Sequence, residues 1–512
     1  MAMTYDTLTQ PQTQEPTPIA FAKVGSPMAI VDGVAFSGGD EWTNYGGNQT
    51  VQTERLFYPK TLEDLKVIVR EARNNNKKVR CVGSGHSWSA TAVTPDYMVS
   101  VNGMDKIHKP VRAQDGSGWT VTLETGVLVS QLDTFLRAHN PPLAVPSQVV
   151  PDVAHSSEFH SNRSLFSSRF NDLSQVRFGG ILTMGCHGGG LNLRTLSDTI
   201  TEMKIVNAHG ELVTYSAAKD PEAFNVACLN LGLLGIIYTA TIKVEEMNTR
   251  LRVTDSFPTL ASLFQSPQAG LNLKALILGN DSTEFFHWPF QRFMQPDQNK
   301  NIWVKESKRT TEPAEDLKKY EGLPPMVDNP FFSTFQTGSR IMEIPDALHF
   351  PIGDGVTTVV DAGCAIKVDS DFKNICETIT ELIEKNWEFA TSMPERKDTA
   401  IEFRFIKASD KILSPAYDKD PETIFCMISI LAVSGTPDFE EYSASIIANW
   451  IGKYNAKPHW PKMWEKVDGI IPYLQREYGD RITRFNRVRK SQDPADMFVN
   501  DTWRPLFQEN EY

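Results

Sequence analysis

Two glycine-rich segments about a hundred residues apart constrain this chain more than any other feature of its sequence. The first spans residues 80–89 (RCVGSGHSWS) and the second spans residues 179–190 (GGILTMGCHGGG). Each follows or interrupts apolar residues typical of a buried strand, and each offers backbone amides that no side chain covers, as in loops that hold a pyrophosphate. Together they predict a dinucleotide cofactor. His86 lies between two small residues of the first segment, so its imidazole is expected to face whatever the loop encloses.

The length and composition indicate a globular protein of two domains. A chain of 512 residues exceeds what one hydrophobic core supports, and its 40% hydrophobic and 22% charged residues are ordinary for a folded protein. The formal net charge of -12 comes without a cluster of Lys and Arg, which argues against a nucleic-acid-binding surface. We therefore expect small molecules as partners.

The ends and the cysteines add two further expectations. Residues 1–18 are polar and carry no apolar core of a signal peptide, and no stretch is long and apolar enough to span a bilayer. These patterns predict a cytoplasmic protein without a membrane span. The six cysteines are scattered and form no C-x-x-C pair, so neither a metal site nor a disulfide framework is expected.

Helix and strand patterns alternate up to about residue 248. Helices are expected over 62–72 after the cap Thr61, over 128–138, and from Pro221 after the cap Asp220. Strands are expected at 79–82, 98–101, 119–123, 204–206, 212–215 and 238–244. Beyond residue 248 the glycines become fewer and aromatic residues cluster, which predicts a domain boundary there.

Four separated motifs then resemble those of a known family. They are Val82–Ser87, Gly180–Gly190, Ile401–Phe405 and Lys457–Lys462, and they occur in the order typical of FAD-linked oxidases of the vanillyl-alcohol oxidase superfamily. Within that superfamily the chain is most similar to aldonolactone and alditol oxidases. No G-x-G-x-x-G motif opens a helix after a strand, so a Rossmann fold is not expected.

The resemblance implies an α+β fold: a PCMH-type FAD-binding domain of two subdomains, plus a cap domain, which holds the substrate, built on a mixed or antiparallel sheet. The limits that we expect are an N-terminal extension over 1–45, the FAD-binding domain over 46–248, and the cap domain over 249–480. Residues 481–512 would form a C-terminal segment that returns to the FAD-binding domain.

The resemblance also implies FAD as the cofactor, bound covalently through His86 to the 8α-methyl group of the flavin, which raises its reduction potential. The alternative for His86 is a hydrogen bond within the loop. A second bond through Cys186 is less favoured, because related enzymes with two bonds carry that cysteine several residues earlier. The other expected cofactor-binding residues are Gly83, Ser84, Gly85, Ser87, Gly180, Gly185, Cys186, Gly188, Gly189 and Ile237.

The expected catalytic residues are Glu402, Arg404, His459 and Lys462. Glu402 and Arg404 are two positions apart on a predicted strand, so their side chains project from one face. The resemblance implies that this pair contacts substrate, that His459 accepts the substrate proton, and that Lys462 stabilises the anionic reduced flavin. The alternative is a surface ion pair and a surface His and Lys in a tryptophan-rich turn. Glu343 is a further, weaker candidate.

Three features depart from the family pattern. Residues 154–172 form an insertion before the second glycine segment, where a residue controlling oxygen access is expected in aldonolactone oxidases. Gly189 stands where alditol oxidases often have a serine near the substrate, and Pro461 replaces a glycine. Oxidase and dehydrogenase activity therefore both stay open.

The sequence predicts an FAD-dependent oxidoreductase acting on CH-OH groups. It would transfer a hydride from a C–H next to oxygen, in a sugar lactone or polyol, to flavin N5, with O2 as the acceptor. The alternative enzyme is a tailoring oxidase of secondary metabolism that acts on an aromatic or alicyclic alcohol. A third hypothesis is a flavoprotein without turnover, in which Glu402→Ala, Arg404→Ala and Lys462→Ala would change nothing.

Overall fold

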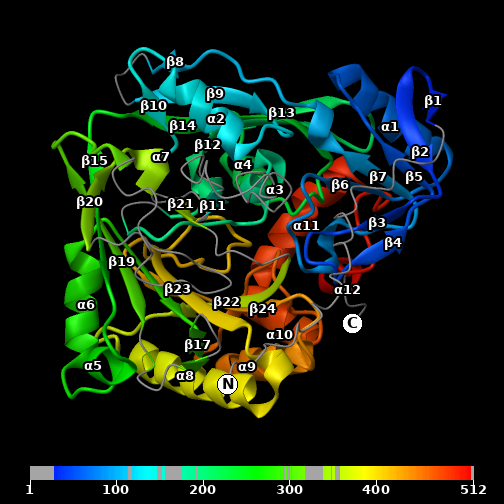
Figure 1. Cartoon of the computed structure of the whole chain (residues 1–512). Helices are drawn as coiled ribbons and strands as arrows, with labels where there is room; N and C mark the ends of the chain where they lie inside the picture. Colours follow the sequence, from blue (N-terminus) through cyan, green and yellow to red (C-terminus); the bar gives the residue numbers. More distant parts are fainter. Residues whose placement is uncertain are drawn as a thin grey trace, which may run out of the picture.

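Three large β-sheets organise the protein (Figure 1). The computed structural model describes residues 28–113, 118–146, 153–155, 176–191, 194–291, 295–296, 300, 302–317, 338–347, 349–351 and 358–508. Most of the 154–172 insertion predicted from the sequence lies outside these residues. Within them, no helix combines the length and the apolar character needed to cross a membrane. All six cysteines are free in the structure.

The first sheet has five strands and ends at the first glycine segment. Its order is β1 (Ala29–Val31), β2 (Val34–Gly38), β5 (Arg55–Phe57), β7 (Tyr97–Ser100) and β6 (Val79–Val82). Helix α1 (Leu62–Asn74) begins at the predicted cap Thr61, whose side chain accepts from the backbone of Asp64. The parallel pairing of β6 with β7 places the end of β6 at the edge of a cavity described below. A small hairpin of β3 (Glu41–Thr43) and β4 (Thr50–Gln52) precedes β5.

The second sheet contains the strands predicted at 204–206 and 212–215 and packs with three helices. Its order is β13 (Leu212–Ser216), β12 (Ile200–Val206), β14 (Ile236–Glu246), β9 (Trp119–Glu124) and β8 (Val111–Arg112), with β10 (Leu143–Ala144) paired to β14. The helices are α2 (Val129–Arg137), α3 (Phe178–Thr183) and α4 (Pro221–Cys228). Asp220 caps α4 by accepting from the backbone of Glu222 and Ala223, which confirms the predicted start of this helix.

The third sheet has eight strands and is antiparallel throughout. Its order is β20 (Ser339–Met342), β15 (Arg250–Ser256), β19 (Trp303–Thr310), β16 (Ser282–His287), β23 (Thr399–Lys407), β24 (Ile424–Val433), β22 (Val359–Lys367) and β25 (Lys457–Pro458). One face packs on helices α5 (Leu260–Phe264), α6 (Ala269–Gly279), α8 (Lys373–Ser392) and α9 (Phe439–Tyr454), at the bottom and left of Figure 1. The other face contributes to the cavity.

The chain also contains several short elements. These are helix α7 (Ile344–Ala347), the parallel pair β11 (Val153–His155) with β21 (His349–Pro351), and the pair β17 (Phe290–Gln291) with β18 (Gln295–Pro296). The predicted α+β class with an antiparallel sheet following the FAD-binding part is therefore confirmed. The chain passes from the second sheet to the third between β14 and β15, close to the domain boundary expected near residue 248. The four domain limits themselves stay a proposal.

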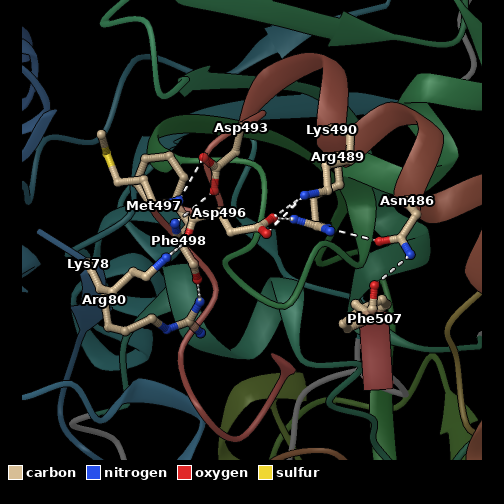
Figure 2. A network of polar contacts seen from close by, with 10 residues as sticks. All are labelled: Lys78, Arg80, Asn486, Arg489, Lys490, Asp493, Asp496, Met497, Phe498 and Phe507. Carbon is tan, nitrogen blue, oxygen red and sulfur yellow. Dashed lines mark hydrogen bonds and ion pairs between the residues drawn. The ribbon is translucent and has the colours of Figure 1, made fainter. Parts of the chain in front are cut away.

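The C-terminal part of the chain returns to the first sheet. It contains helices α10 (Ile470–Tyr478), α11 (Asp480–Gln492) and α12 (Arg504–Phe507). After α11, Asp493 accepts hydrogen bonds from the backbone of Met497 and Phe498, which bends the chain toward β6. Figure 2 shows this turn beside Asp493. The carbonyl oxygen of Met497 then accepts from the backbone N–H of Val79 at 2.9 Å. A segment remote in sequence thus fixes the strand that leads into the first glycine segment.

His287 at the end of β16 supplies a prediction about acid stability. Its side chain is fully buried, neither ring nitrogen has a hydrogen-bond partner among the described residues, and burial lowers its pKa to about 3. The folded state therefore holds a neutral imidazole, while the unfolded chain takes up a proton below about pH 6.5, so this group destabilises the fold as pH falls. In His287→Leu, the free energy of unfolding should fall less steeply between pH 6.5 and 4, by about 1.4 kcal/mol per pH unit. Urea unfolding at several pH values measures the slope, and an unchanged slope would contradict the prediction.

Candidate active site

A cavity of about 300 Å³ lies where the three sheets meet. Residues from the ends of β6 and β9, from β14, and from β22, β23 and β24 line it together with both glycine segments. The structure brings most of the predicted site residues to its wall. These are Gly83, Ser84, Gly85, His86, Ser87, Gly180, Cys186, Ile237, Glu402, Arg404, His459 and Lys462. Gly185, Gly188 and Gly189 are not among the residues that line it.

The first glycine segment follows β6 and requires glycine at Gly85. This residue has φ +72°, and a Cβ atom there would lie 3.3 Å from the ring of Trp42. The backbone N–H of Tyr45 donates to the carbonyl oxygen of Gly85 at 2.9 Å, which presses the turn against the neighbouring loop. Gly83 is equally close to another segment, because a Cβ atom there would lie 3.1 Å from Cβ of Arg177.

His86 presents an unused nitrogen in this cavity. Its ring stacks on the ring of Tyr45 with centroids 4.3 Å apart, and its Nδ1 is buried without a hydrogen-bond partner in the described part of the chain. Burial lowers the pKa of His86 to about 4, so the imidazole is neutral at neutral pH. A neutral imidazole with an unpaired nitrogen is a group that can bond to a ligand in the cavity.

The second glycine segment is partly helical, whereas its composition predicted a loop throughout. Helix α3 covers its first half, because the buried side chains of Phe178, Ile181 and Leu182 repeat at helical spacing. Gly180 lies on this helix, and a Cβ atom there would meet nothing within 4 Å, so its backbone borders open space. Gly185 then adopts φ +73° and turns the chain beyond the helix.

The later glycines of this segment contact the third sheet instead of the cavity. The carbonyl oxygen of Gly189 accepts from the backbone of Thr283 at 3.3 Å, and a Cβ atom at Gly189 would lie 3.0 Å from the side chain of Glu284. Close packing therefore explains Gly189. Cys186 does line the cavity, and burial raises the pKa of its thiol to about 11. A protonated thiol is a poor nucleophile, which disfavours a second bond to the cofactor.

Glu402 and Arg404 lie in the middle of the third sheet, on its cavity face. Arg404 Nη2 lies 2.8 Å from Glu402 Oε1, and both side chains are about nine-tenths buried. Burial raises the pKa of Glu402, while the charge of Arg404 lowers it. The alternative of a surface ion pair is therefore wrong. The pair offers a fixed guanidinium and a carboxylate to a bound polar molecule.

His459 and Lys462 lie in a turn directly after β25. The backbone N–H of His459 donates to the carbonyl oxygen of Gly363 at 2.9 Å, and its Nε2 lies 3.2 Å from the carbonyl oxygen of Gly185. Burial lowers the pKa of His459 to about 3. The ammonium of Lys462 pairs with the carboxylate of Asp361 and lies 4.4 Å from the ring centroid of Trp88. Both side chains are thus held by groups from other segments.

Sequence reasoning missed Asp361, Tyr45 and Trp88 as parts of the site. Asp361 lies in the otherwise apolar strand β22, and a charged residue in such a strand is a signal that would have marked it. Tyr45 and Trp88 carry no comparable signal. Glu343, the weaker candidate, lies elsewhere: it pairs with Arg137 at 3.1 Å and does not line the cavity. The described residues contain no cluster of side chains suited to a metal ion.

Comparison with known families agrees with this geometry. Residues 53–153 match the family described as FAD binding domain, and residues 368–506 match the family described as D-arabinono-1,4-lactone oxidase. Both matches support the resemblance to FAD-linked oxidases of the vanillyl-alcohol oxidase superfamily. The first match covers His86 and the second covers Glu402, Arg404, His459 and Lys462. The resemblance and FAD as the cofactor, both predicted from the sequence, are therefore confirmed, while the covalent bond through His86 stays a prediction.

Relatives of similar length extend over almost the whole chain. L-gulono-1,4-lactone dehydrogenase of Mycobacterium tuberculosis is 24% identical over 90% of this chain and 98% of its own. D-arabinono-1,4-lactone oxidase of Eremothecium gossypii is 22% identical over 93% of this chain and 97% of its own. Cholesterol oxidase from B. sterolicum has a similar fold, with a TM-score of 0.69 at 15% identity, covering 94% of this chain and 100% of that chain.

The residues of the cavity fit an FAD molecule. The open space beside Gly180 and the bare turns of the first glycine segment leave room for a pyrophosphate next to backbone amides. The unpaired Nδ1 of His86 lies in the same cavity as Glu402, Arg404 and Lys462. A single cavity therefore offers both a cofactor cradle and charged groups for a substrate.

Proposed function

We propose that this protein oxidises a hydroxyl-bearing carbon of a sugar lactone or polyol, with O2 as the electron acceptor. The observation that carries the proposal is the buried Glu402–Arg404 pair, 2.8 Å apart, facing the cavity that the glycine segments enclose. The lactone oxidoreductases that align end to end with this chain support the substrate class. These relatives are named both as oxidases and as dehydrogenases, so their names do not specify the electron acceptor, and O2 needs its own test.

The charged side chains of the cavity have different roles in the proposed reaction. Bound FAD supplies the hydride acceptor. Arg404 donates hydrogen bonds to a carbonyl or hydroxyl oxygen of the substrate and orients the reacting carbon. Glu402, whose pKa burial raises, accepts the proton of the substrate hydroxyl. Lys462 contributes positive charge to the cavity wall.

His459 receives a different role from the one that the resemblance implied. Its low pKa makes it a weak base, and its Nε2 lies beside the carbonyl oxygen of Gly185. This contact suits a residue that ties the second glycine segment to the 457–462 motif. We therefore propose that Glu402, and not His459, accepts the proton of the substrate hydroxyl, and that His459 anchors the second glycine segment.

A covalent bond between His86 and FAD gives a direct prediction. After acid denaturation and removal of small molecules, the wild-type chain should keep its yellow colour and the mass of FAD, because Nδ1 of His86 has no other partner among the residues that the structure describes. His86→Ala should release all its flavin. Mass spectrometry of the intact chain measures both. Colour lost from the wild type would leave FAD noncovalent, and absence of flavin from folded wild type would contradict the family itself.

The acceptor and the substrate class are tested together. Peroxide release in air and dye reduction under nitrogen should be compared for sugar lactones, polyols and apolar alcohols. Peroxide formed from lactones or polyols supports the proposal, while turnover with dye alone indicates a dehydrogenase. Preference for apolar alcohols would favour the tailoring oxidase, which the end-to-end lactone relatives do not favour. The cytoplasmic location stays a prediction, which microscopy of the tagged protein tests.

A further inference from the structure

The ammonium of Lys462 is held by two side chains from other parts of the chain. Asp361, on β22, pairs with it through Oδ2, and the ring of Trp88, just after the first glycine segment, lies 4.4 Å away. A carboxylate and an aromatic face on one ammonium restrict its position more than either alone. Lys462 therefore does not move freely along the cavity wall.

The buried carboxylate of Asp361 in turn depends on its contact with the ammonium of Lys462. Its side chain is 2% exposed in a strand of apolar residues, and its Oδ1 makes no hydrogen bond within the described residues. Burial raises the pKa of Asp361, while Lys462 and Ser429 lower it. A buried carboxylate is retained only where a cation or strong donors offset its lost hydration. Lys462 is the cation that pairs directly with it, and the charge of Arg404 also lowers its pKa.

Backbone contacts fix the three segments that bring this pair together. The carbonyl oxygen of Asp361 accepts from Met463 N at 2.9 Å, one residue beyond Lys462. The backbone N–H of Trp88 donates to the carbonyl oxygen of Pro461 at 2.7 Å, and its indole N–H donates to the carbonyl oxygen of Val359 at 2.6 Å. The 459–462 turn is thus held against β22 and against the first glycine segment. Pro461, which replaces the family's glycine, contributes through its carbonyl oxygen.

We propose that Asp361 is a positioning residue that fixes the Lys462 ammonium at the cavity wall, where its charge acts on the flavin. The inference rests on the proposed function, because it requires FAD in this cavity. It adds to that function a residue of the cavity wall that works through Lys462.

Sulfite binding tests the proposal without turnover. Sulfite adds to flavin and leaves a negative charge on it, so a fixed positive charge nearby strengthens binding. Titration followed by loss of the flavin's visible absorbance gives the Kd. We expect Asp361→Asn to weaken sulfite binding by about tenfold and Lys462→Met by about a hundredfold. In the double variant, Asp361→Asn should add nothing to Lys462→Met, because Asp361 acts through that lysine.

Asp255 offers a matched control on the same sheet. It is also a buried carboxylate paired with a cation, Arg340, and it lies outside the cavity lining. Asp255→Asn should lower the unfolding temperature and leave the sulfite Kd unchanged. If Asp361→Asn does not fold, Asp361→Glu keeps the charge and moves the carboxylate by one methylene, and we expect about threefold weaker binding.

The outcomes separate the two proposals. Wild-type protein without flavin would overturn the proposed function and this inference with it. Flavin with an unchanged sulfite Kd in Asp361→Asn or, where that variant does not fold, in Asp361→Glu would overturn the inference alone. An equal loss of affinity from Asp361→Asn in the presence and absence of Lys462 would overturn it as well, because Asp361 would then act independently.

Discussion

Arg404→Met is expected to lower kcat/KM for the best lactone or polyol substrate by about a thousandfold, with FAD still bound. The guanidinium is buried, lies 2.8 Å from Glu402 Oε1, and faces the cavity. Methionine removes the donor that orients the substrate oxygen and leaves Glu402 without its cation. Steady-state kinetics with flavin content normalised by absorbance measures the loss.

Two further variants define what such a loss would mean. Arg404→Lys keeps a charge but not the planar fork, so we expect it to recover only a small part of the activity. Arg309→Met is the control: Arg309 lies on β19 of the same sheet, pairs with Glu245 at 2.7 Å, and does not line the cavity. Its kcat/KM should match wild type. Arg404→Met with activity within tenfold of wild type would contradict the role assigned to Arg404.

The cost of Arg404→Met to stability follows from its neighbours on the sheet. Arg404 lies opposite Glu284, Glu284 opposite Lys305, and Lys305 joins β19 to β15, where Asp255 is its register partner. These four side chains are buried and alternate in sign across four strands. Replacing one cation in such a row leaves carboxylates uncompensated, which typically costs about 3–5 kcal/mol. In the double variant with Arg404→Met, Glu402→Gln should recover part of that loss, because it removes one uncompensated carboxylate.

Local patterns were enough to predict many elements of the FAD-binding part. Thr61 and Asp220 each accept hydrogen bonds from the first turn of a helix, and a cap residue followed by apolar spacing is a signal contained in a few neighbouring residues. Strand β6 was predicted with its observed limits because Val79 and Val82, both β-branched, begin and end a four-residue run that precedes a glycine turn. The Glu402–Arg404 pair was predicted on one face for the same reason: strand periodicity is local.

The parts that sequence did not supply depend on register between remote strands. Asp361 meets Lys462 only because β22 pairs with both β24 and β25, and nothing near Asp361 in the sequence specifies those partners. The second glycine segment shows the opposite error. Its glycines suggested an open loop, but burial of apolar side chains made its first half a helix, and Gly189 serves close packing against Glu284. Glycine content alone therefore does not distinguish a loop that binds a cofactor from a position where two segments pack closely.

Arg80→Met is expected to be the most destabilising single substitution outside the cavity's charged pairs. Arg80 lies on β6, is 5% exposed, and burial lowers its pKa to about 10. Its guanidinium donates to the carbonyl oxygens of Leu231 at 2.9 Å, Gly232 at 3.0 Å and Phe498 at 2.7 Å. Figure 2 shows the last of these bonds, beside the Asp493 turn.

These three acceptors belong to two remote segments, so one side chain joins the first sheet, the turn before β14, and the C-terminal segment. Methionine fills similar volume but leaves buried carbonyl oxygens without donors, at about 1–3 kcal/mol for each such group. We expect a total loss of about 3–5 kcal/mol in the free energy of unfolding, measured by urea denaturation. FAD occupancy should fall as well, because β6 leads directly into the first glycine segment and its position depends on these contacts.

Arg70→Met is the matched control for this experiment. Arg70 lies on α1 of the same part of the chain and pairs with Asp32 at 3.0 Å, but both side chains are about half exposed or more. Exposed pairs contribute less than about 1 kcal/mol, so its unfolding curve should nearly overlay that of wild type. An Arg80→Met curve that does the same would show that the C-terminal segment is held by its other contacts, chiefly the bond between Val79 and Met497. A large loss confined to Arg80→Met would instead make this guanidinium the link that holds the C-terminal segment and the cofactor strand together.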